Sequence, residues 1–126
     1  MSNGGDAMID IRMGEIEARF ADMIWEKGPI NSGLLAQLAE KELGWKKSTT
    51  YTILKRFCQK GIFQNEKGVV SALVTKEEFR ALQSEKVVEE SFGGSLPAFV
   101  AAFGTRKKLS PEEITQLQQL VDAMKG

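Results

Sequence analysis

The sequence of 126 residues contains no histidine, and its only cysteine is Cys58. A zinc or copper site made from the usual imidazole and thiolate ligands cannot form within one such chain. Catalysis by a nucleophile paired with histidine is excluded for the same reason. The lone cysteine allows no internal disulfide, which fits a reducing compartment. We therefore expect no metal, no other cofactor and no small-molecule substrate.

Long hydrophobic runs are also missing. No stretch has the apolar length of a membrane span, and no basic segment followed by an apolar one resembles a secretory leader. We expect a cytoplasmic protein that does not insert into a membrane. With 42% hydrophobic residues, the chain can form one modest core and a short appendage.

The formal net charge is zero, but the charges are unevenly distributed. Residues 1–42 contain four Lys or Arg against eight Asp or Glu, and residues 76–126 contain seven against eight. Residues 43–75 contain six against one, a local charge of +5. Such a cluster is typical of a phosphate-binding surface, although a solvated basic helix face gives the same count. Its place in the fold decides between the two.

The pattern of apolar residues predicts the organisation of the first part of the chain. Low-complexity residues 1–13 predict a flexible tail. Helical spacing then predicts a helix after Gly14 that ends at Gly28-Pro29, a second helix capped by Ser32, and a third over about residues 46–59. The first of these would bury Ile16, Phe20, Met23 and Ile24, and the second Leu35, Leu38 and Ala39.

Two strand-like runs follow, at residues 62–64 and 69–74, and residues 65–68 between them predict a hairpin. Three helices and then a hairpin is the order of a winged helix-turn-helix. We therefore expect a mainly α fold with a small β-hairpin wing over residues 14–75.

The third helix is the candidate recognition helix. Its inward stripe is Thr50, Ile53, Leu54, Phe57 and Cys58, and its opposite face is Ser48, Thr49, Thr52, Lys55, Arg56 and Gln59, with no carboxylate. Short hydroxyl side chains let a helix approach base edges closely, although surface threonines are also common without such a role. We expect base contacts from Thr49, Thr52 and Arg56. We expect contacts to the DNA backbone from Lys46, Lys47, Ser48, Lys55 and the hairpin residue Lys67.

Three other residues have simpler interpretations. Cys58 could be a redox sensor, but its place on the apolar stripe and the lack of a second thiol favour a buried structural residue. We interpret Trp25 and Trp45 as packing residues and not as platforms on which bases stack.

Residues 76–126 predict a helical dimerisation segment. A capping box at residues 75–78 starts a helix that ends near Phe92, a short helix covers residues 95–103, and Ser110-Pro111 opens a last helix. These short helices either fold back onto the winged helix or pack on a second chain, and we favour a homodimer. The expected interface residues are Phe79, Leu82, Val88, Leu96, Phe99, Val100, Phe103, Ile114, Leu117, Leu120 and Val121.

The Met23-Ile24-Trp25 triplet, Trp45 and residues 49–61 resemble the penicillinase-repressor (BlaI/MecI/CopY) family, and the similarity covers about residues 14–124. The resemblance implies a transcriptional repressor that binds palindromic operators in double-stranded DNA as a homodimer formed by its C-terminal helices. In several members, a membrane-bound sensor protease triggers cleavage inside those helices.

Two departures from the family pattern matter. Thr50 replaces the usual aliphatic residue, and the asparagine–phenylalanine bond cleaved in the family corresponds to Ala102-Phe103 here, our candidate cleavage site. The cysteine-rich metal site of the copper-responsive branch is absent.

A second functional class remains open, because winged helices also serve as protein-interaction modules without DNA binding. The basic, acid-free third helix favours a DNA-binding protein. An enzyme is the weakest alternative, since the pairs Glu77-Glu78 and Glu112-Glu113 are explained by helix capping and no nucleophile–base pair is evident.

Overall fold

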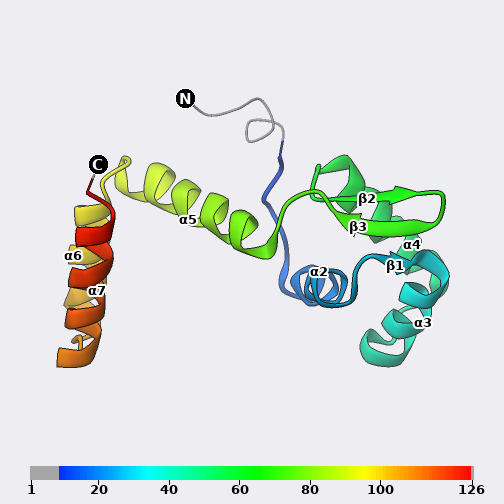
Figure 1. The fold of residues 1–126 in the computed structure, drawn as a ribbon, viewed down its shortest axis with the longest axis horizontal. Helices are drawn as coiled ribbons and strands as arrows, with labels where there is room; N and C mark the ends of the chain where they lie inside the picture. Colours follow the sequence, from blue (N-terminus) through cyan, green and yellow to red (C-terminus); the bar gives the residue numbers. More distant parts are fainter. Residues whose placement is uncertain (1–8, 126) are drawn as a thin grey trace. The chain divides into compact units, whose positions relative to one another are not determined.

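The structure is a computed structural model that describes residues 9–125, so most of the expected tail, residues 1–8, lies outside the described part. It confirms a mainly helical fold with a small antiparallel sheet, in the order expected for a winged helix followed by further helices (Figure 1). The elements are α2 (Glu15–Lys27), β1 (Ile30–Asn31), α3 (Ser32–Leu43), α4 (Lys47–Gln59), β2 (Phe63–Glu66), β3 (Val69–Ala72), α5 (Lys76–Phe92), α6 (Leu96–Arg106) and α7 (Pro111–Ala123).

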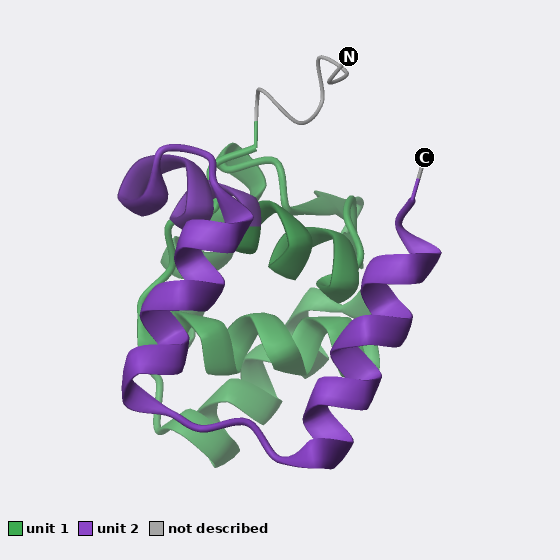
Figure 2. Cartoon of the chain, turned by 90° about the vertical axis from the view of Figure 1, so that its left-hand side faces the viewer, with its two compact units in different colours: residues 1–84 green, residues 85–126 purple. Residues whose placement is uncertain are grey.

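The chain contacts divide it into an N-terminal unit that ends at Ser84 and a C-terminal unit that begins at Glu85 (Figure 2). We expected the second segment to begin at Lys76, before α5, but the boundary lies inside this helix. The reason is Phe79, which is 3% exposed and packs on Trp25 with ring centroids 5.4 Å apart. Phe79 is thus a core residue of the N-terminal unit, and its assignment to the dimer interface is corrected.

The N-terminal unit contains a three-stranded antiparallel sheet with the order β1-β3-β2. Strands β2 and β3 pair from Phe63 opposite Ala72 to Glu66 opposite Val69, which leaves a two-residue turn at Lys67-Gly68. Both turn residues have positive φ, 52° and 81°, as a type I′ turn requires. This tight turn extends β2 two residues beyond the predicted end. Strand β1 was not predicted, because two residues carry no periodic signal.

The core of this unit joins all its elements. Phe20 and Ile24 of α2, Leu35 of α3, Phe57 of α4 and Phe63 of β2 are each at most 1% exposed. Each such side chain stabilises the fold by about 1.5–3 kcal/mol relative to exposure. The stacked rings of Phe20 and Phe57, with centroids 5.6 Å apart, lie between α2 and α4 and fix the distance between these helices.

Both tryptophans pack between elements, as predicted. The Trp45 ring lies 5.0 Å from that of Phe20, and the Trp25 ring lies 5.1 Å from that of Phe63. The Trp25 indole Nε1 also donates a hydrogen bond of 3.0 Å to the carbonyl oxygen of Val74. The prediction that Ile16 of α2 is buried is wrong. Ile16 is 44% exposed, because it lies in the first turn, before α2 reaches the core.

The N-terminal caps of the helices follow the sequence with one exception. Asn31, and not Ser32, caps α3: its Oδ1 accepts hydrogen bonds from the amides of Gly33 and Leu34, at 2.9 and 3.3 Å. The predicted capping boxes are present before α5, where Glu78 accepts from the amide of Thr75 at 2.8 Å, and before α7. These acidic residues therefore stabilise the starts of α5 and α7 as helix caps.

Residues 9–13 were expected to belong to the tail but lie along the body of the N-terminal unit. Ile9, Ile11 and Met13 pack against the core. The Asp10 amide donates to the carbonyl oxygen of Lys60 at 3.1 Å, and Gln83 Nε2 donates to that of Ile11 at 3.3 Å. The alternation of apolar residues in this segment was the available signal.

The C-terminal unit contains the end of α5 together with α6 and α7. The α6 helix continues to Arg106, about one turn beyond the predicted end at Phe103, because Gly104 is accommodated inside it. Phe92 and Phe99 meet edge to face with centroids 5.4 Å apart. No residue of α6 or α7 is buried. Across residues 9–125, none of the helices has the length and apolar character needed to cross a membrane.

Candidate nucleic-acid interface

The α4 helix presents two different faces. Thr50, Leu54 and Phe57 are at most 2% exposed and hold the helix against the core, while Ile53 and Cys58 are half-buried beside them. The residues of the opposite face are all exposed: Ser48, Thr49, Thr52, Lys55, Arg56 and Gln59. The predicted inward stripe and outward polar face are therefore both present, which fixes the direction in which the polar side chains point.

The hydroxyl hydrogen of Thr52 is already used in a hydrogen bond within α4. Its Oγ1 donates a hydrogen bond of 2.9 Å to the backbone carbonyl oxygen of Ser48, one turn earlier in α4. The lone pairs of this oxygen and the side-chain methyl group remain on the exposed face. Thr52 can thus accept a hydrogen bond from a base amino group or contact a thymine methyl group.

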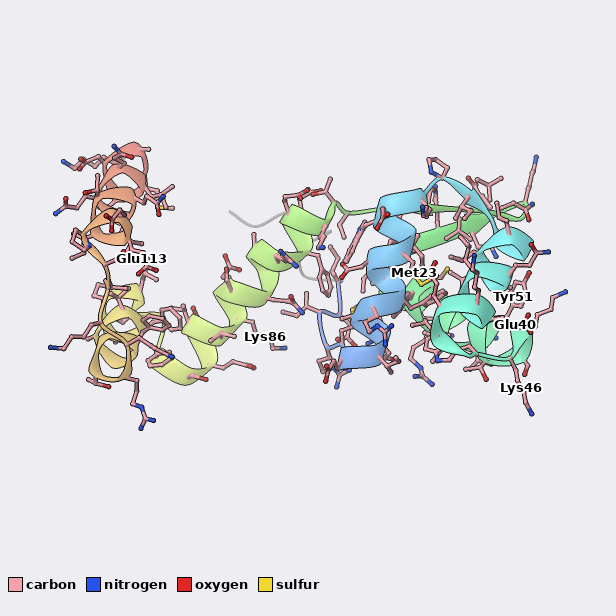
Figure 3. The ribbon with its side chains drawn as sticks, turned by 90° about the horizontal axis from the view of Figure 1, so that it is seen from below. Met23, Glu40, Lys46, Tyr51, Lys86 and Glu113 are labelled. Atoms are coloured by element: carbon pink, nitrogen blue, oxygen red, sulfur yellow. The ribbon has the colours of Figure 1, made fainter. Side chains whose placement is uncertain are left out.

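The start of α4 is basic and lacks a side-chain cap. Lys46 is the N-cap residue, and its ammonium group has no acceptor with which to cap the amides of the first turn. The Lys47 ammonium lies 6.0 Å from the centroid of the Tyr51 ring, and the Tyr51 hydroxyl donates to Ser32 Oγ at 3.3 Å. Lys46 and Tyr51 are labelled in Figure 3. Free amides, the helix dipole and two ammonium groups together favour an anion at this end.

Tyr51 is a residue that sequence reasoning missed. It joins α4 to the first turn of α3 and lies under the Lys47 side chain. Its place between the inward and outward faces of α4 was readable from the helical period, but its partner on α3 was not.

Arg56 is paired with an acidic residue from another helix. Its Nη1 donates to Glu17 Oε2 at 3.2 Å, and the other oxygen of this carboxylate accepts from the Gly14 amide at 3.0 Å. The hydrogen bond from Gly14 and the interaction with Arg56 lower the pKa of Glu17. The outward face of α4 has no carboxylate of its own, but α2 supplies one at its flank.

Lys67 occupies the tip of the β2–β3 hairpin, as predicted, and is exposed there. Its left-handed backbone is one that turns of this kind impose on both central residues. Lys67 therefore lies on the β2–β3 hairpin and not on α4, where most of the other candidate contact residues lie.

Two buried or half-buried groups of α4 have no evident role in binding. Thr50 is 0% exposed, and its Oγ1 has no hydrogen-bond partner within residues 9–125. Burial raises the pKa of the Cys58 thiol, which disfavours the reactive thiolate and supports the structural interpretation of this residue. No group of three metal-ligand side chains gathers in the part of the chain that the structure describes.

The expected dimerisation residues of the C-terminal unit form an exposed apolar surface. Phe99, Val100 and Phe103 of α6 and Leu117 and Leu120 of α7 line a groove of about 320 Å³. The exposed members of the predicted set are Leu96, Val100, Phe103, Ile114, Leu117, Leu120 and Val121, which are 40–57% exposed. Val88 and Phe99 are half-buried, and so is Leu82, which lies in the N-terminal unit.

The candidate cleavage site has a different setting from the one expected. The predicted helix over residues 95–103 puts Ala102-Phe103 at its C-terminal end. Both residues are exposed, but the bond lies inside α6, which continues to Arg106. A protease therefore needs this last turn of α6 to open before it can bind the chain in extended form.

Comparison with known proteins identifies related sequences across both units. The family described as penicillinase repressor matches residues 13–123. A penicillinase repressor of Bacillus licheniformis is 24% identical over 119 residues, which cover 91% of this chain and 93% of that protein. A protein of Latilactobacillus sakei, named as an uncharacterised 16.5 kDa protein in the ptsI 3′ region, is 30% identical over 105 residues, or 80% of this chain and 72% of its own length.

Proposed function

The chain belongs to the penicillinase repressor family, and we propose that it is a homodimeric transcriptional repressor that binds palindromic operator DNA. In this proposal, α4 enters the major groove, and the β2–β3 hairpin contacts the adjacent DNA backbone. The C-terminal helices join two copies, so that two α4 helices reach the two halves of one operator.

The observation that carries the proposal is the outward face of α4. It combines hydroxyl groups that permit close approach with Lys55 and Arg56, and the basic pair Lys46-Lys47 lies at its start. Thr49, Thr52 and Arg56 are assigned to base edges. Lys46, Lys47, Ser48, Lys55 and Lys67 are assigned to phosphates. The inward stripe of α4 supports this assignment, because it is the face that packs on the core and it leaves the polar face exposed.

The exposed apolar surface of the C-terminal unit supports the homodimer. The groove between α6 and α7 is lined mainly by apolar side chains, and both helices have further apolar residues exposed around it. Exposed apolar surface that extends over neighbouring helices is typical of an interface. A second copy presents the same surface, so a two-fold contact covers both grooves at once. The same symmetry matches a palindromic operator.

Proteolysis by a membrane-bound sensor protease is the proposed way in which repression is relieved. Cleavage at Ala102-Phe103 would separate Phe99 and Val100 from α7, which supplies Leu117 and Leu120 to the same groove. The dimer would lose much of its apolar contact, and operator affinity would fall because the two α4 helices are no longer linked. Mass spectrometry of the protein from cells treated with a cell-wall antibiotic tests this step. An intact chain alongside active target genes would contradict it.

The salt dependence of DNA binding tests the proposed function. If about six to ten phosphates are neutralised by the dimer, raising the salt from about 50 to about 200 mM weakens binding about a thousandfold or more. Fluorescence anisotropy with labelled promoter fragments measures this slope. The absence of binding at low salt, or a flat response to salt, would contradict DNA binding and favour a protein-interaction module.

A further inference from the structure

The pair formed by Arg56 and Glu17 lies on the flank of the proposed DNA-binding face. A helix turns by about 100° per residue, so Arg56 lies within about 20° of Thr49 and about 40° of Thr52 around the axis of α4. The three side chains therefore share one strip of the exposed surface. The Arg56 side chain is 50% exposed, and Glu17 is only 17% exposed.

The carboxylate of Glu17 is itself fixed by the start of α2. Its Oε1 accepts from the Gly14 amide at 3.0 Å, as part of the capping box, and its Oε2 accepts from Arg56 Nη1 at 3.2 Å. Both oxygens are thus engaged, each by a different element. A carboxylate held in this way provides a rigid anchor for a long arginine side chain.

The anchor uses only part of the guanidinium. This group carries five N–H donors in one plane, and within residues 9–125 a single donor, on Nη1, is directed at a side chain, that of Glu17. The other donors retain the fork that matches O6 and N7 of a guanine. Because arginine loses considerable rotamer entropy on binding, an anchor that holds it before contact makes the contact more selective.

From this geometry we propose that Glu17 is a positioning residue for DNA recognition, which holds Arg56 in the orientation that reads a guanine in each half of the operator. The inference rests on the proposed function and adds a specificity determinant that lies on α2, outside the recognition helix. A carboxylate near DNA also repels phosphates whatever the sequence, so overall affinity does not isolate the positioning role of Glu17, whereas base preference does.

The variant Glu17→Gln tests the role with little change to the fold. Glutamine can still accept from the Gly14 amide, which preserves the capping box. It removes the negative charge that attracts Arg56. The matched control is Glu15→Gln, which removes an exposed charge from the same helical turn, where Glu15 forms no salt bridge within residues 9–125.

A library of randomised DNA duplexes, sequenced after selection, gives the base preference at every position. We expect Glu17→Gln to lower the guanine preference at one position per half-site by about fivefold or more, the size typical of coupling between contacting residues. Arg56→Ala should abolish the same preference, and the double variant should match Arg56→Ala. The control Glu15→Gln should keep the preferences of the unaltered protein.

The mobility of the Arg56 side chain in the free protein provides a second readout. We expect ¹⁵N relaxation of its Nε–H group to show restricted motion in the unaltered protein and increased motion in Glu17→Gln. Equal preferences in Glu17→Gln and Glu15→Gln, a uniform loss over all sequences, or a mobile Arg56 in the unaltered protein would overturn this inference alone. If the unaltered protein selects no sequence and binds no duplex, the proposed function fails and the inference fails with it.

Discussion

The two units of the chain differ in how they bury their large side chains. In the N-terminal unit, Phe20, Phe57 and Phe63 are fully buried. In the C-terminal unit, α6 and α7 contain no buried residue, and Leu120 and Val121 are more than half exposed. Both segments are amphipathic in sequence, so hydrophobic pattern alone does not distinguish them. In the proposed homodimer, the N-terminal unit folds on its own chain, whereas the C-terminal unit completes its core with the second copy.

Truncation is the strongest way to break this comparison. A chain that ends after Ser84 keeps Phe79 and should fold as a monomer. Its affinity for operator DNA should fall about 10²- to 10⁴-fold, because the two N-terminal units are no longer linked to each other. Analytical ultracentrifugation gives the oligomeric state, and a mobility-shift titration gives the affinity.

A chain that ends after Thr75 is the control for the unit boundary. It lacks Phe79 and exposes one face of Trp25, so it should be less stable than the longer fragment by about 3–5 kcal/mol, the usual cost of removing a buried phenylalanine. Dimers of either fragment would place the interface in the N-terminal unit and contradict the comparison.

Two alanine substitutions sharpen the contrast within the full chain. Phe79→Ala should lower the free energy of unfolding by about 3–5 kcal/mol, because Phe79 is 3% exposed. Phe103→Ala, at a residue that is 49% exposed, should leave the fold intact and weaken dimer association by about 1–2 kcal/mol or more. Urea denaturation and sedimentation equilibrium measure the two quantities. The reverse pattern, with Phe79→Ala affecting only association, would contradict the assignment of Phe79 to the core.

The elements that were predictable from sequence are those with local signals. The period of α4, the turn chemistry of Lys67-Gly68 and the capping boxes before α5 and α7 depend on residues a few positions apart. The features that were missed depend on distant partners. Strand β1 exists because Ile30 pairs with Val70, and Arg56 meets Glu17 across 39 positions of sequence.

Helical periodicity also cannot tell which surface an apolar residue will cover. Phe79 of α5 and Phe103 of α6 both lie on amphipathic helices, yet one is buried in its own unit and the other is exposed. The end of α6 was misplaced because glycine is disfavoured in a helix by only about 1 kcal/mol, which the neighbouring turns can offset. Residue types at a site were thus readable, but the contacts that orient them were not.

Thr50 allows a smaller test of the N-terminal core. Its hydroxyl oxygen is buried without a partner within residues 9–125, and valine has nearly the same shape. Thr50→Val should therefore raise the free energy of unfolding by about 1–2 kcal/mol, because an unsatisfied polar group is removed from the core. Thr49→Val, on the exposed face one position earlier, should give no comparable gain. Thermal denaturation of both variants measures the difference, and a loss of stability in Thr50→Val would mean that the hydroxyl has a partner.

The smallest expected effect is the response of the N-terminal unit to acid. Hydrogen bonds and nearby cations lower the pKa of Glu17 below its ordinary value of 4.5, and backbone and side-chain hydrogen bonds from Thr75 lower the pKa of Glu78 in the same direction. A carboxyl group whose pKa is lowered on folding contributes stability above its unfolded pKa and loses this contribution as the pH falls through its folded pKa. The loss should begin near pH 4.5 and continue below it.

Melting temperatures between about pH 6 and about pH 3 measure the effect. In Glu17→Gln the decline should be shallower, since this variant carries no titrating group at that position. Identical declines in the two proteins would show that the hydrogen bonds of Glu17 contribute nothing measurable to the stability of the unit.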